Sequence, residues 1–317
     1  MQASVIIPTY QRERFLLDTL DCVRNQDFPK DAYEILIVDN GPHPSPELAG
    51  LKELGGKPVI RYLHEPCNGL HHARHAGARD AQGVILVYID DDVHCPPGWL
   101  AAMLGQYRNP KVAMVAGKVE LAYETEPPPW LQQFRGILSA LDRGESPHPL
   151  PLFSSPVGCN MSVRKYVLFK VGGFNPDGFG DQRLLHLRGD GECGLARKVQ
   201  EAGWLIWYEP RAWLWHRVPA SRMTPEYIRR RSALAGIECA YAVLRYQKRS
   251  LLHLLYSSIG CMGKSLYHRL SVTRCRPQGQ MHHTALASRY FHRAVQHWRQ
   301  AKSKYLRKHT SQESYLR

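Results

Sequence analysis

The chain has 317 residues, 44% apolar and 22% charged, an ordinary globular composition that excludes a fibrous or disordered protein. Its eight cysteines are scattered singly without CxxC pairs, which argues against a zinc ribbon or a disulfide framework and suits a reducing compartment. The net charge of +14 lies at one end: from Tyr241 to Arg317 there are 15 Lys and Arg and one acid, whereas the first 240 residues carry 27 of each sign. Such a tail indicates a negatively charged partner, either a membrane surface or a nucleic acid.

The chain shows no sign of a signal peptide or a spanning helix. Its first residues run directly into an apolar strand, without a basic start followed by an apolar stretch. No window approaches ~20 uninterrupted apolar residues. We therefore expect a cytoplasmic protein, with any membrane contact made peripherally at the inner face of the plasma membrane.

Short apolar runs and helically spaced segments alternate over the first ninety residues. The expected strands are 4–7, 34–38, 59–63 and 84–89, and the expected helices are 14–24 and 70–81. Continuous apolar strands separated by helices predict a mostly parallel α/β sheet that is covered on both faces. Three polar clusters follow these strands, at Thr9-Tyr10, Asp39-Asn40 and Asp90 to Asp92. Ligands bind outside the carboxyl ends of such strands, so we expect the clusters to meet in one crevice.

The second half of the chain is less regular. Prolines at 127–129 and 147–151 interrupt a loop region that could cover the crevice. Further strands are expected at 157–163, 204–208 and 211–218, with a helix over 190–202. After Pro225 the pattern becomes helical and increasingly basic. These features divide the chain into an α/β domain, 1–240, and a basic, mainly helical C-terminal region, 241–317.

The three adjacent carboxylates Asp90, Asp91 and Asp92 indicate a metal site. At the end of a buried strand they repel one another, and a divalent ion such as Mn²⁺ or Mg²⁺ removes that conflict. Side chains alternate along extended chain, so Asp90 and Asp92 should point one way and Asp91 the other. The alternative is a solvated acidic loop or a helix cap before Pro96-Pro97.

Other polar residues have a functional and a purely structural interpretation. Asp39 could accept a hydrogen bond from a nucleotide base or ribose, or could only form a turn. Arg74, on the 70–81 helix, could contact a phosphate or be a surface cation. Asp190 and Glu192 open a helix, where an acid can serve as a general base or simply favour the helix dipole. His216 could bind a metal or pack in the core.

Six stretches then stand in a familiar order: VIIPTYQRERFL, ILIVDNGP, CNGLHHARHAG, VYIDDDV, GCNM, and GDGE followed by LARKVQEAG. Together they resemble the inverting family 2 glycosyltransferases, over about residues 3 to 235. The resemblance implies the GT-A fold, a Rossmann-like mixed sheet of nucleotide-diphospho-sugar transferases, here with a basic helical C-terminal extension. It also implies a donor such as a UDP-sugar, a divalent metal and a saccharide or lipid-linked hydroxyl acceptor.

The resemblance carries site roles onto this chain by position. The donor nucleotide is expected to contact Pro8, Thr9, Tyr10, Asp39, Arg74 and Asp90, and the metal is expected to bind Asp92, Asp90 and His216. Glu192 is the expected catalytic base, with Asp190 as its competitor. Gly158 and Asn160 are expected to line the sugar and acceptor pocket. Two departures matter. The family's Glu-Asp pair is Asp-Gly-Glu here, and the position after Arg74, commonly Asn, is His75.

The implied reaction is a single in-line displacement. The acceptor hydroxyl attacks the anomeric carbon from the face opposite the leaving nucleoside diphosphate, so that configuration is inverted. The metal neutralises charge on the diphosphate, and Glu192 or Asp190 removes the acceptor's proton. Such an enzyme would serve cell-surface polysaccharide or glycolipid synthesis.

The basic tail leaves several interpretations open. Leu251 to Ile259, flanked by Lys248, Arg249 and Lys264, could form an amphipathic helix on an anionic membrane surface. It could equally belong to a basic helical subdomain packed on the α/β domain. A nucleic-acid-binding protein is an alternative function, because aromatic residues are interleaved with the tail's arginines, although the neutral body and the acid-lined crevice count against it. A nucleotidyltransferase is a third.

Overall fold

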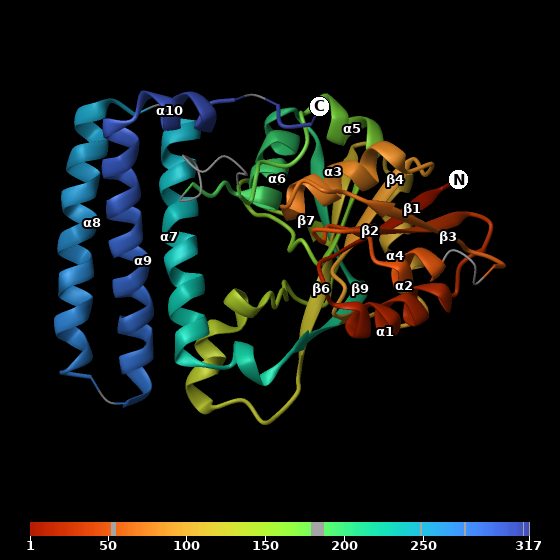
Figure 1. The fold of residues 1–317 in the computed structure, drawn as a ribbon, viewed down its shortest axis with the longest axis horizontal. Coiled ribbons are helices and arrows are strands. Elements are labelled where there is room, and N and C mark those ends of the chain that lie inside the picture. The colour runs from red at the N-terminus through yellow and green to blue at the C-terminus, as the bar shows by residue number, and fades with distance from the viewer. Residues whose placement is uncertain (52–54, 179–186, 248, 276, 313, 317) are drawn as a thin grey trace.

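The computed structural model describes residues 1–51, 55–178, 187–247, 249–275, 277–312 and 314–316, so Lys248 lies outside the described residues. A nine-stranded sheet forms the body, in the order β3-β2-β1-β4-β8-β6-β9-β5, with β7 paired to β9. The predicted mixed α/β sheet is therefore confirmed (Figure 1).

Four parallel strands make the N-terminal half of the sheet. They are β1 (Ala3–Thr9), β2 (Tyr33–Asp39), β3 (Val59–His64) and β4 (Ile85–Ile89). Residues of β1, β2 and β4 are buried throughout, because helices cover both faces. Helices α1 (Glu13–Arg24) and α3 (Leu70–Asp80) lie on opposite sides of the sheet (Figure 1). These elements agree closely with those predicted from apolar periodicity.

The C-terminal half of the sheet is mixed. Strand β8 (Asn160–Arg164) runs antiparallel to β4 and to β6 (Val112–Tyr123), whereas β6 runs parallel to β9 (Leu205–Val218). Two short strands, β5 (Val93–His94) and β7 (His148–Pro149), pair antiparallel with β9. The sequence does not predict β6, and the sheet is parallel within β1 to β4 and again between β6 and β9, with β8 antiparallel between these two parts.

Strand β9 replaces the two strands predicted at 204–208 and 211–218. Its register with β6 jumps between the pairs Gly117↔Glu209 and Val119↔Leu214, so Pro210 falls in a bulge rather than between strands. At this bulge a Cβ on Gly117 would lie 2.1 Å from the carbonyl oxygen of Ala212. Only glycine allows the two backbones to approach so closely.

Shorter helices complete the body. They are α2 (Pro46–Gly50), α4 (Trp99–Gly105), α5 (Lys165–Lys170) and α6 (Gly191–Glu201), with 3₁₀ turns at Gln106–Arg108, Pro129–Leu138 and Ala220–Arg222. The predicted proline-rich loop thus contains a 3₁₀ segment, Pro129–Leu138. This segment packs on α7 and α9, where Leu131, Phe134 and Leu138 join a second, smaller apolar core.

The C-terminal region is a helical array. It comprises α7 (Pro225–Gln247), α8 (Leu251–Val272), α9 (Pro277–Lys302) and α10 (Lys304–Thr310). Helix α9 packs between α7 and α8, and α8 is the outermost helix (Figure 1). Helix α7 runs across the expected boundary at residue 240. No helix in the described part of the chain has both the length and the apolar composition to cross a bilayer.

Asn160 joins three elements of the body. It is fully buried; its Oδ1 accepts a hydrogen bond from Trp99 Nε1 at 2.9 Å, and its Nδ2 donates to the carbonyl oxygens of Lys118 and Ala212 at 2.8 Å each. Asn160→Ala would leave three buried polar groups unpaired. We expect the free energy of unfolding to fall by about 3 kcal/mol, measured by urea denaturation.

The control is Asn25→Ala, because Asn25 is exposed and makes one side-chain hydrogen bond, to Asp21 at 3.1 Å. It should change the free energy of unfolding by less than about 0.5 kcal/mol. Equal losses in the two variants would contradict a locking role for Asn160.

Candidate active site

Two clefts adjoin at the carboxyl edge of the sheet. The first, here the β1 cleft, has a volume of about 260 Å³ and is lined by Pro8, Thr9, Tyr10, Arg12, Asn40, Asn68, Gly69, Leu70, Ala73, Asp90, Asp91 and Asp177. The second, here the α6 cleft, has a volume of about 280 Å³; its polar lining includes His71, Arg74, Asp90, Asp177, Arg188, Asp190, Glu192, His216, Arg222, Arg231 and Glu238. Leu70, Asp90 and Asp177 line both clefts, so the two are neighbouring parts of one site.

Asp90, Asp92 and His216 meet beside this site. One possible ligand atom from each lies within 4.8 Å of the others. Asp90 and Asp92 follow β4, while His216 comes from β9, where it pairs with Val93 of β5. The short β5–β9 pairing therefore places His216 next to Asp92 across more than a hundred residues of sequence.

Asp91 does not belong to this group, as predicted, although residues 91 and 92 form a turn rather than extended chain. Its Oδ2 accepts a hydrogen bond from Thr9 Oγ1 at 2.8 Å, and its Oδ1 accepts one from Arg12 Nη1 at 2.8 Å. Burial raises the pKa of Asp91 to about 7, against the opposing effect of Arg12. Asp91 thus anchors the loop after β1 to the acidic segment.

Asp92 is surrounded by cations. Its Oδ2 accepts hydrogen bonds from Arg12 Nη2 at 2.7 Å and lies 3.1 Å from Arg222 Nη2. Burial alone would raise its pKa, but His216, Arg12 and Arg222 outweigh burial and lower it. Asp92 is therefore ionised, and the cost of burying its charge is offset by these partners.

The remaining oxygen of Asp92 and the ring of His216 suit a metal ion. Asp92 Oδ1 is buried, accepts no hydrogen bond from the described residues, and lies 3.3 Å from His216 Nε2. His216 Nδ1 is 3.0 Å from the carbonyl oxygen of Leu138, which can only accept, so Nδ1 carries a hydrogen and Nε2 faces Asp92. An imidazole oriented through its other nitrogen is typical of metal ligands. Two carboxylates and one such imidazole can hold a hard divalent ion.

Arg74 lies between the metal-binding group and α6. Its guanidinium is buried, 3.6 Å from Asp90 Oδ1 and 3.6 Å from Glu192 Oε2, and stacks over the ring of Phe174. Its Nε has no hydrogen-bond partner within the described residues. Gly158 leaves room for it, because a Cβ there would lie 2.3 Å from Arg74 Nη2. This arrangement provides a cation inside the α6 cleft that could contact a ligand.

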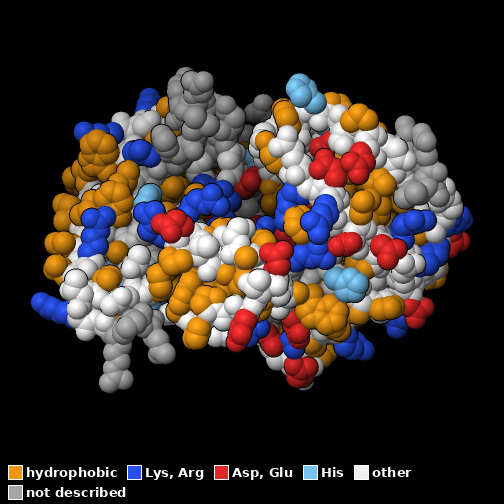
Figure 2. Space-filling view, turned by 60° about the horizontal axis from the view of Figure 1, so that its bottom comes forward, with side chains coloured by type: hydrophobic (Ala, Val, Ile, Leu, Met, Phe, Trp, Pro, Cys, Tyr) orange, Lys and Arg blue, Asp and Glu red, His pale blue; other side chains and the backbone are white. Residues whose placement is uncertain are grey.

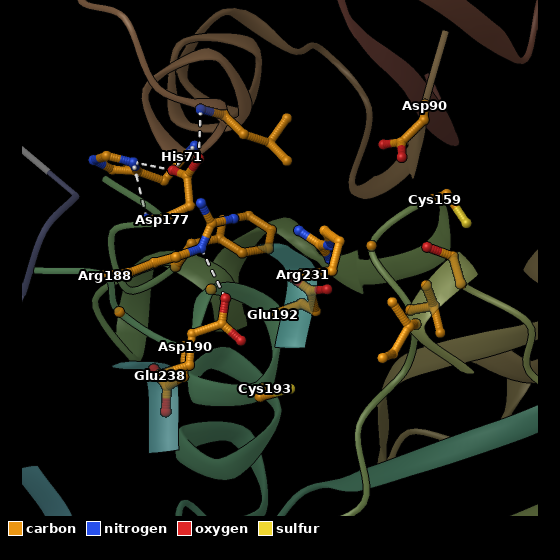
Figure 3. A pocket seen from close by; sticks show the side chains of 18 of the residues that line it. His71, Asp90, Cys159, Asp177, Arg188, Asp190, Glu192, Cys193, Arg231 and Glu238 are labelled. Atoms are coloured by element: carbon orange, nitrogen blue, oxygen red, sulfur yellow. Dashed lines mark hydrogen bonds and ion pairs between the residues drawn. The ribbon is translucent and has the colours of Figure 1, made fainter. Parts of the chain in front are cut away.

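The two candidate bases, Asp190 and Glu192, have different surroundings. Asp190 Oδ1 accepts a hydrogen bond from Asn175 Nδ2 at 2.6 Å, and burial raises the pKa of Asp190. Glu192 lies on the first turn of α6 with a side chain 31% exposed, and its one ion-pair partner among the described residues is Arg74. Figure 3 shows both acids facing the cleft from α6, across from Asp90. Glu192 is the less constrained of the two.

Asp39 and Asn160 are not among the residues that line either cleft in the described structure. Asp39 accepts hydrogen bonds from the N–H groups of Gly41 and Ser45, at 2.9 Å each, and from the Tyr62 hydroxyl at 2.8 Å. It thus has the turn-forming role that the sequence left open. Asn160 is occupied by Trp99, Lys118 and Ala212. Each side-chain polar atom of these two residues already has a hydrogen-bond partner within the protein.

A pair that the sequence analysis did not identify joins the two clefts. The Asp177 carboxylate accepts hydrogen bonds from the N–H groups of Leu70 and His71, at the start of α3, and lies 2.5 Å from His71 Nδ1 (Figure 3). Burial opposes the ionisation of Asp177, but His71 lowers its pKa overall. The sequence gives no sign of this pair, because Asp177 comes from a distant loop with no motif.

His75 has a structural role. It is 1% exposed, and its Nε2 accepts a hydrogen bond from the Phe174 N–H at 2.9 Å, so the folded protein requires the neutral ring. Burial lowers its pKa from 6.5 to about 3. Between these two pKa values the unfolded chain binds a proton at His75 that the folded protein does not bind. The free energy of unfolding therefore falls as the pH falls, by up to about 1.4 kcal/mol per pH unit.

We expect His75→Asn to weaken this pH dependence, because an amide oxygen can accept the same hydrogen bond without titrating. Urea denaturation of both proteins at about pH 7 and about pH 5 checks this. The wild type should lose more stability than the variant over that interval. Equal losses would show that His75 does not carry the dependence.

Two solved structures resemble this chain along most of its length. The mannosyltransferase PcManGT from Pyrobaculum calidifontis, in complex with GDP-Man and Mn²⁺, has a TM-score of 0.58 and 18% identity, covering 96% of this chain and 75% of that one. GalNAc-T7 with UDP, GalNAc and Mn²⁺ has a TM-score of 0.54 and 14% identity, covering 77% and 50%. The mixed sheet and the acidic group at its carboxyl edge therefore define a GT-A fold.

Residues 4–172 match the model of glycosyl transferase family 2, which is more than half of the chain. The protein belongs to that family, as the ordered motifs predicted. Glycosyltransferase AglE from Haloferax volcanii is 31% identical over 126 residues, 38% of this chain and 40% of that protein. Pre-mycofactocin glycosyltransferase from Mycobacterium tuberculosis is 28% identical over 186 residues, 57% and 37% of the two chains. The matches thus cover about two fifths of each relative's length.

Proposed function

We propose that this protein is a metal-dependent, inverting glycosyltransferase. It transfers a sugar from a nucleoside-diphosphate sugar to a hydroxyl acceptor, in cell-surface polysaccharide or glycolipid synthesis. One observation carries the proposal: Asp90, Asp92 and His216 converge at the edge of a cleft that Glu192 faces from α6. Membership of glycosyl transferase family 2 supports the reaction class.

Asp90, Asp92 and His216 would hold the divalent ion, Mn²⁺ or Mg²⁺. Bound there, the ion supplies a Lewis acid that neutralises negative charge on the leaving diphosphate. Arg12 and Arg222 hold one oxygen of Asp92 while its other oxygen accepts no hydrogen bond. The arginines therefore fix the carboxylate and leave Asp92 Oδ1 for the ion. Arg222 Nη1 also lies 3.3 Å from His216 Nε2, and the ion would replace that contact.

We assign the nucleotide of the donor to the β1 cleft. Pro8, Thr9 and Tyr10 line this cleft, and Asp90 links it to the α6 cleft. We retain a UDP-sugar as the first donor to test. GDP-Man and UDP in the similar structures are ligands of those proteins and define the other donors worth testing.

We assign the sugar and the acceptor to the α6 cleft, where Gly158 and Arg74 lie beside Glu192. A base in an inverting displacement takes the proton from the acceptor hydroxyl as that oxygen attacks the anomeric carbon. Glu192 suits this role because its carboxylate is partly exposed to the cleft, whereas Asp190 is hydrogen-bonded to Asn175. The acceptor is a saccharide or a lipid-linked hydroxyl, reached where residues 241–317 contact an anionic membrane surface at its cytoplasmic face.

A thermal-shift panel of UDP-, GDP- and dTDP-sugars with and without Mn²⁺ tests the proposal. We expect one nucleotide class to raise the melting temperature only when Mn²⁺ is present. No stabilisation by any donor, together with salt-sensitive binding of DNA or RNA, would favour a nucleic-acid-binding protein instead. Pyrophosphate release from a nucleoside triphosphate would favour a nucleotidyltransferase.

A further inference from the structure

Helix α8 exposes its large apolar side chains. Leu252, Tyr256 and Ile259 are 79%, 75% and 72% exposed. Further exposed residues on the helix are Leu251, Leu255, Met262, Leu266, Tyr267 and Leu270. Positions that recur every three or four residues share one face of a helix, so these side chains form a continuous row. We call this row the α8 apolar face.

The opposite face of α8 packs on α9 and buries Leu254 together with smaller and polar residues. Ser258 and Ser265 donate hydrogen bonds to the carbonyl oxygens of Ala294 and Ala287, at 2.9 Å each. Cys261, between them, is buried. In a protein surrounded by water the large apolar residues of a helix face the core. Apart from the buried Leu254, the large apolar residues named above face outward on α8, which is favourable only if something apolar covers its outer face.

The α8 apolar face lies at the edge of the molecule. Helix α8 is the outermost helix, and hydrophobic side chains gather along the corresponding left edge of the space-filling view (Figure 1, Figure 2). Isolated exposed hydrophobic residues are ordinary, but a contiguous row of this size marks a contact surface.

The positive charge of α8 and α9 indicates which kind of partner contacts the α8 apolar face. Residues 251–302 contain eight Lys and Arg and no acid. Lys264 and Arg269 are exposed on α8 itself, where each lies over an aromatic ring of α9, Tyr290 and Phe291. A second copy placed face to face would bring basic surfaces together, which is unfavourable. A surface that is apolar inside and negatively charged outside matches both features.

We infer that the α8 apolar face docks in the plane of an anionic lipid bilayer. The apolar side chains would lie at the boundary between headgroups and acyl chains, and the surrounding Lys and Arg side chains would reach lipid phosphates. Because this inference rests on the proposed function, and defines the membrane contact named there, its test is chosen to be independent of sugar transfer.

The test is flotation of the full chain with vesicles of phosphatidylcholine alone and of phosphatidylcholine mixed with phosphatidylglycerol. We expect binding to the mixed vesicles and much weaker binding to the neutral ones. The double variant Leu252→Ser with Ile259→Ser removes apolar surface and no charge. It should lower vesicle binding by about tenfold or more for each side chain.

The matched control is Leu152→Ser with Val84→Ser, two aliphatic residues of the body that are 71% and 64% exposed. This control should bind vesicles like the wild type. Circular dichroism checks that both double variants fold, and donor-induced thermal shift is measured on each. If no donor changes the melting temperature but the protein still binds vesicles, the result would count against the proposed function and not against the membrane contact.

Three outcomes would overturn the inference. These are no flotation of the wild type with anionic vesicles, unchanged flotation of the Leu252→Ser, Ile259→Ser variant, and flotation lost equally in the Leu152→Ser, Val84→Ser control. A concentration-dependent dimer in light scattering that the α8 substitutions dissociate, without vesicle binding, would assign the face to a second copy of the chain.

Discussion

Asp92→Asn is expected to abolish the response of the protein to Mn²⁺ and to lower sugar transfer by about a hundredfold or more. The substitution keeps the size of the side chain but removes its negative charge and one of its two anionic oxygens. Asp92 Oδ1 is the buried oxygen that accepts no hydrogen bond and lies 3.3 Å from His216 Nε2. The measurement is the Mn²⁺-dependent rise in melting temperature with the donor found in the thermal-shift panel, followed by a transfer assay.

Asp91→Asn is the matched control for this experiment, because Asp91 is the adjacent buried acid and points toward Thr9 and Arg12. Its amide oxygen can still accept the hydrogen bond from Arg12 while its NH₂ group donates to the Thr9 hydroxyl, so the Mn²⁺ response should survive. An intact Mn²⁺ response in Asp92→Asn would show that the ion is held elsewhere. If both variants lost the Mn²⁺ response equally, the substitutions would be acting through the conformation of the acidic segment rather than through a metal ligand.

Glu192→Gln is expected to lower the turnover number by about 10²–10⁴-fold while leaving Mn²⁺-dependent donor binding unchanged. Glutamine keeps the reach of the side chain toward the cleft but cannot take a proton from the acceptor hydroxyl. The separation of binding from turnover is the distinctive result, since Glu192 faces the α6 cleft and is absent from the metal-binding group. Donor thermal shift and initial transfer rates measured on one preparation give both quantities.

Asp190→Asn controls for the loss of a carboxylate at the start of the same helix. Asp190 accepts a hydrogen bond from Asn175 at 2.6 Å, so its substitution should act on the local structure and lower turnover by less than about tenfold. Full activity in Glu192→Gln combined with a large loss in Asp190→Asn would reverse the two assignments.

The sequence alone predicted the parallel half of the sheet and the place of the site. Strands such as 34–38 and 84–89 are continuous apolar runs, because both of their faces are buried, and such runs are visible without tertiary information. The polar residues after them had to meet at one sheet edge. The structure also keeps Asp91 apart from the group of Asp90, Asp92 and His216, as predicted, although a turn at residues 91 and 92 does this rather than alternation along extended chain.

Family resemblance alone supplied the role of Asn160, and it favoured one of the two interpretations that the residues left open for His216 and for Glu192. The structure brings His216 to Asp92 and turns Glu192 toward the cleft, but it buries Asn160 among Trp99, Lys118 and Ala212. A motif predicts the helix or strand on which a residue lies. It does not predict whether the side chain is already hydrogen-bonded within the protein, because those partners come from elements distant in sequence.

Tertiary structure alone decided the partners of the acidic segment and the orientation of the outer helix. Arg12 and Arg222 resemble ordinary surface cations in the sequence, and only the packing of β1, β4 and β9 brings both to Asp92. Likewise, 251–259 was recognisable as an apolar, base-flanked segment, and the sequence allowed its apolar side to face either the body or a membrane. The packing of Ser258 and Ser265 on α9 turns that side outward, because the row of large apolar residues lies on the opposite side of the helix from the two serines.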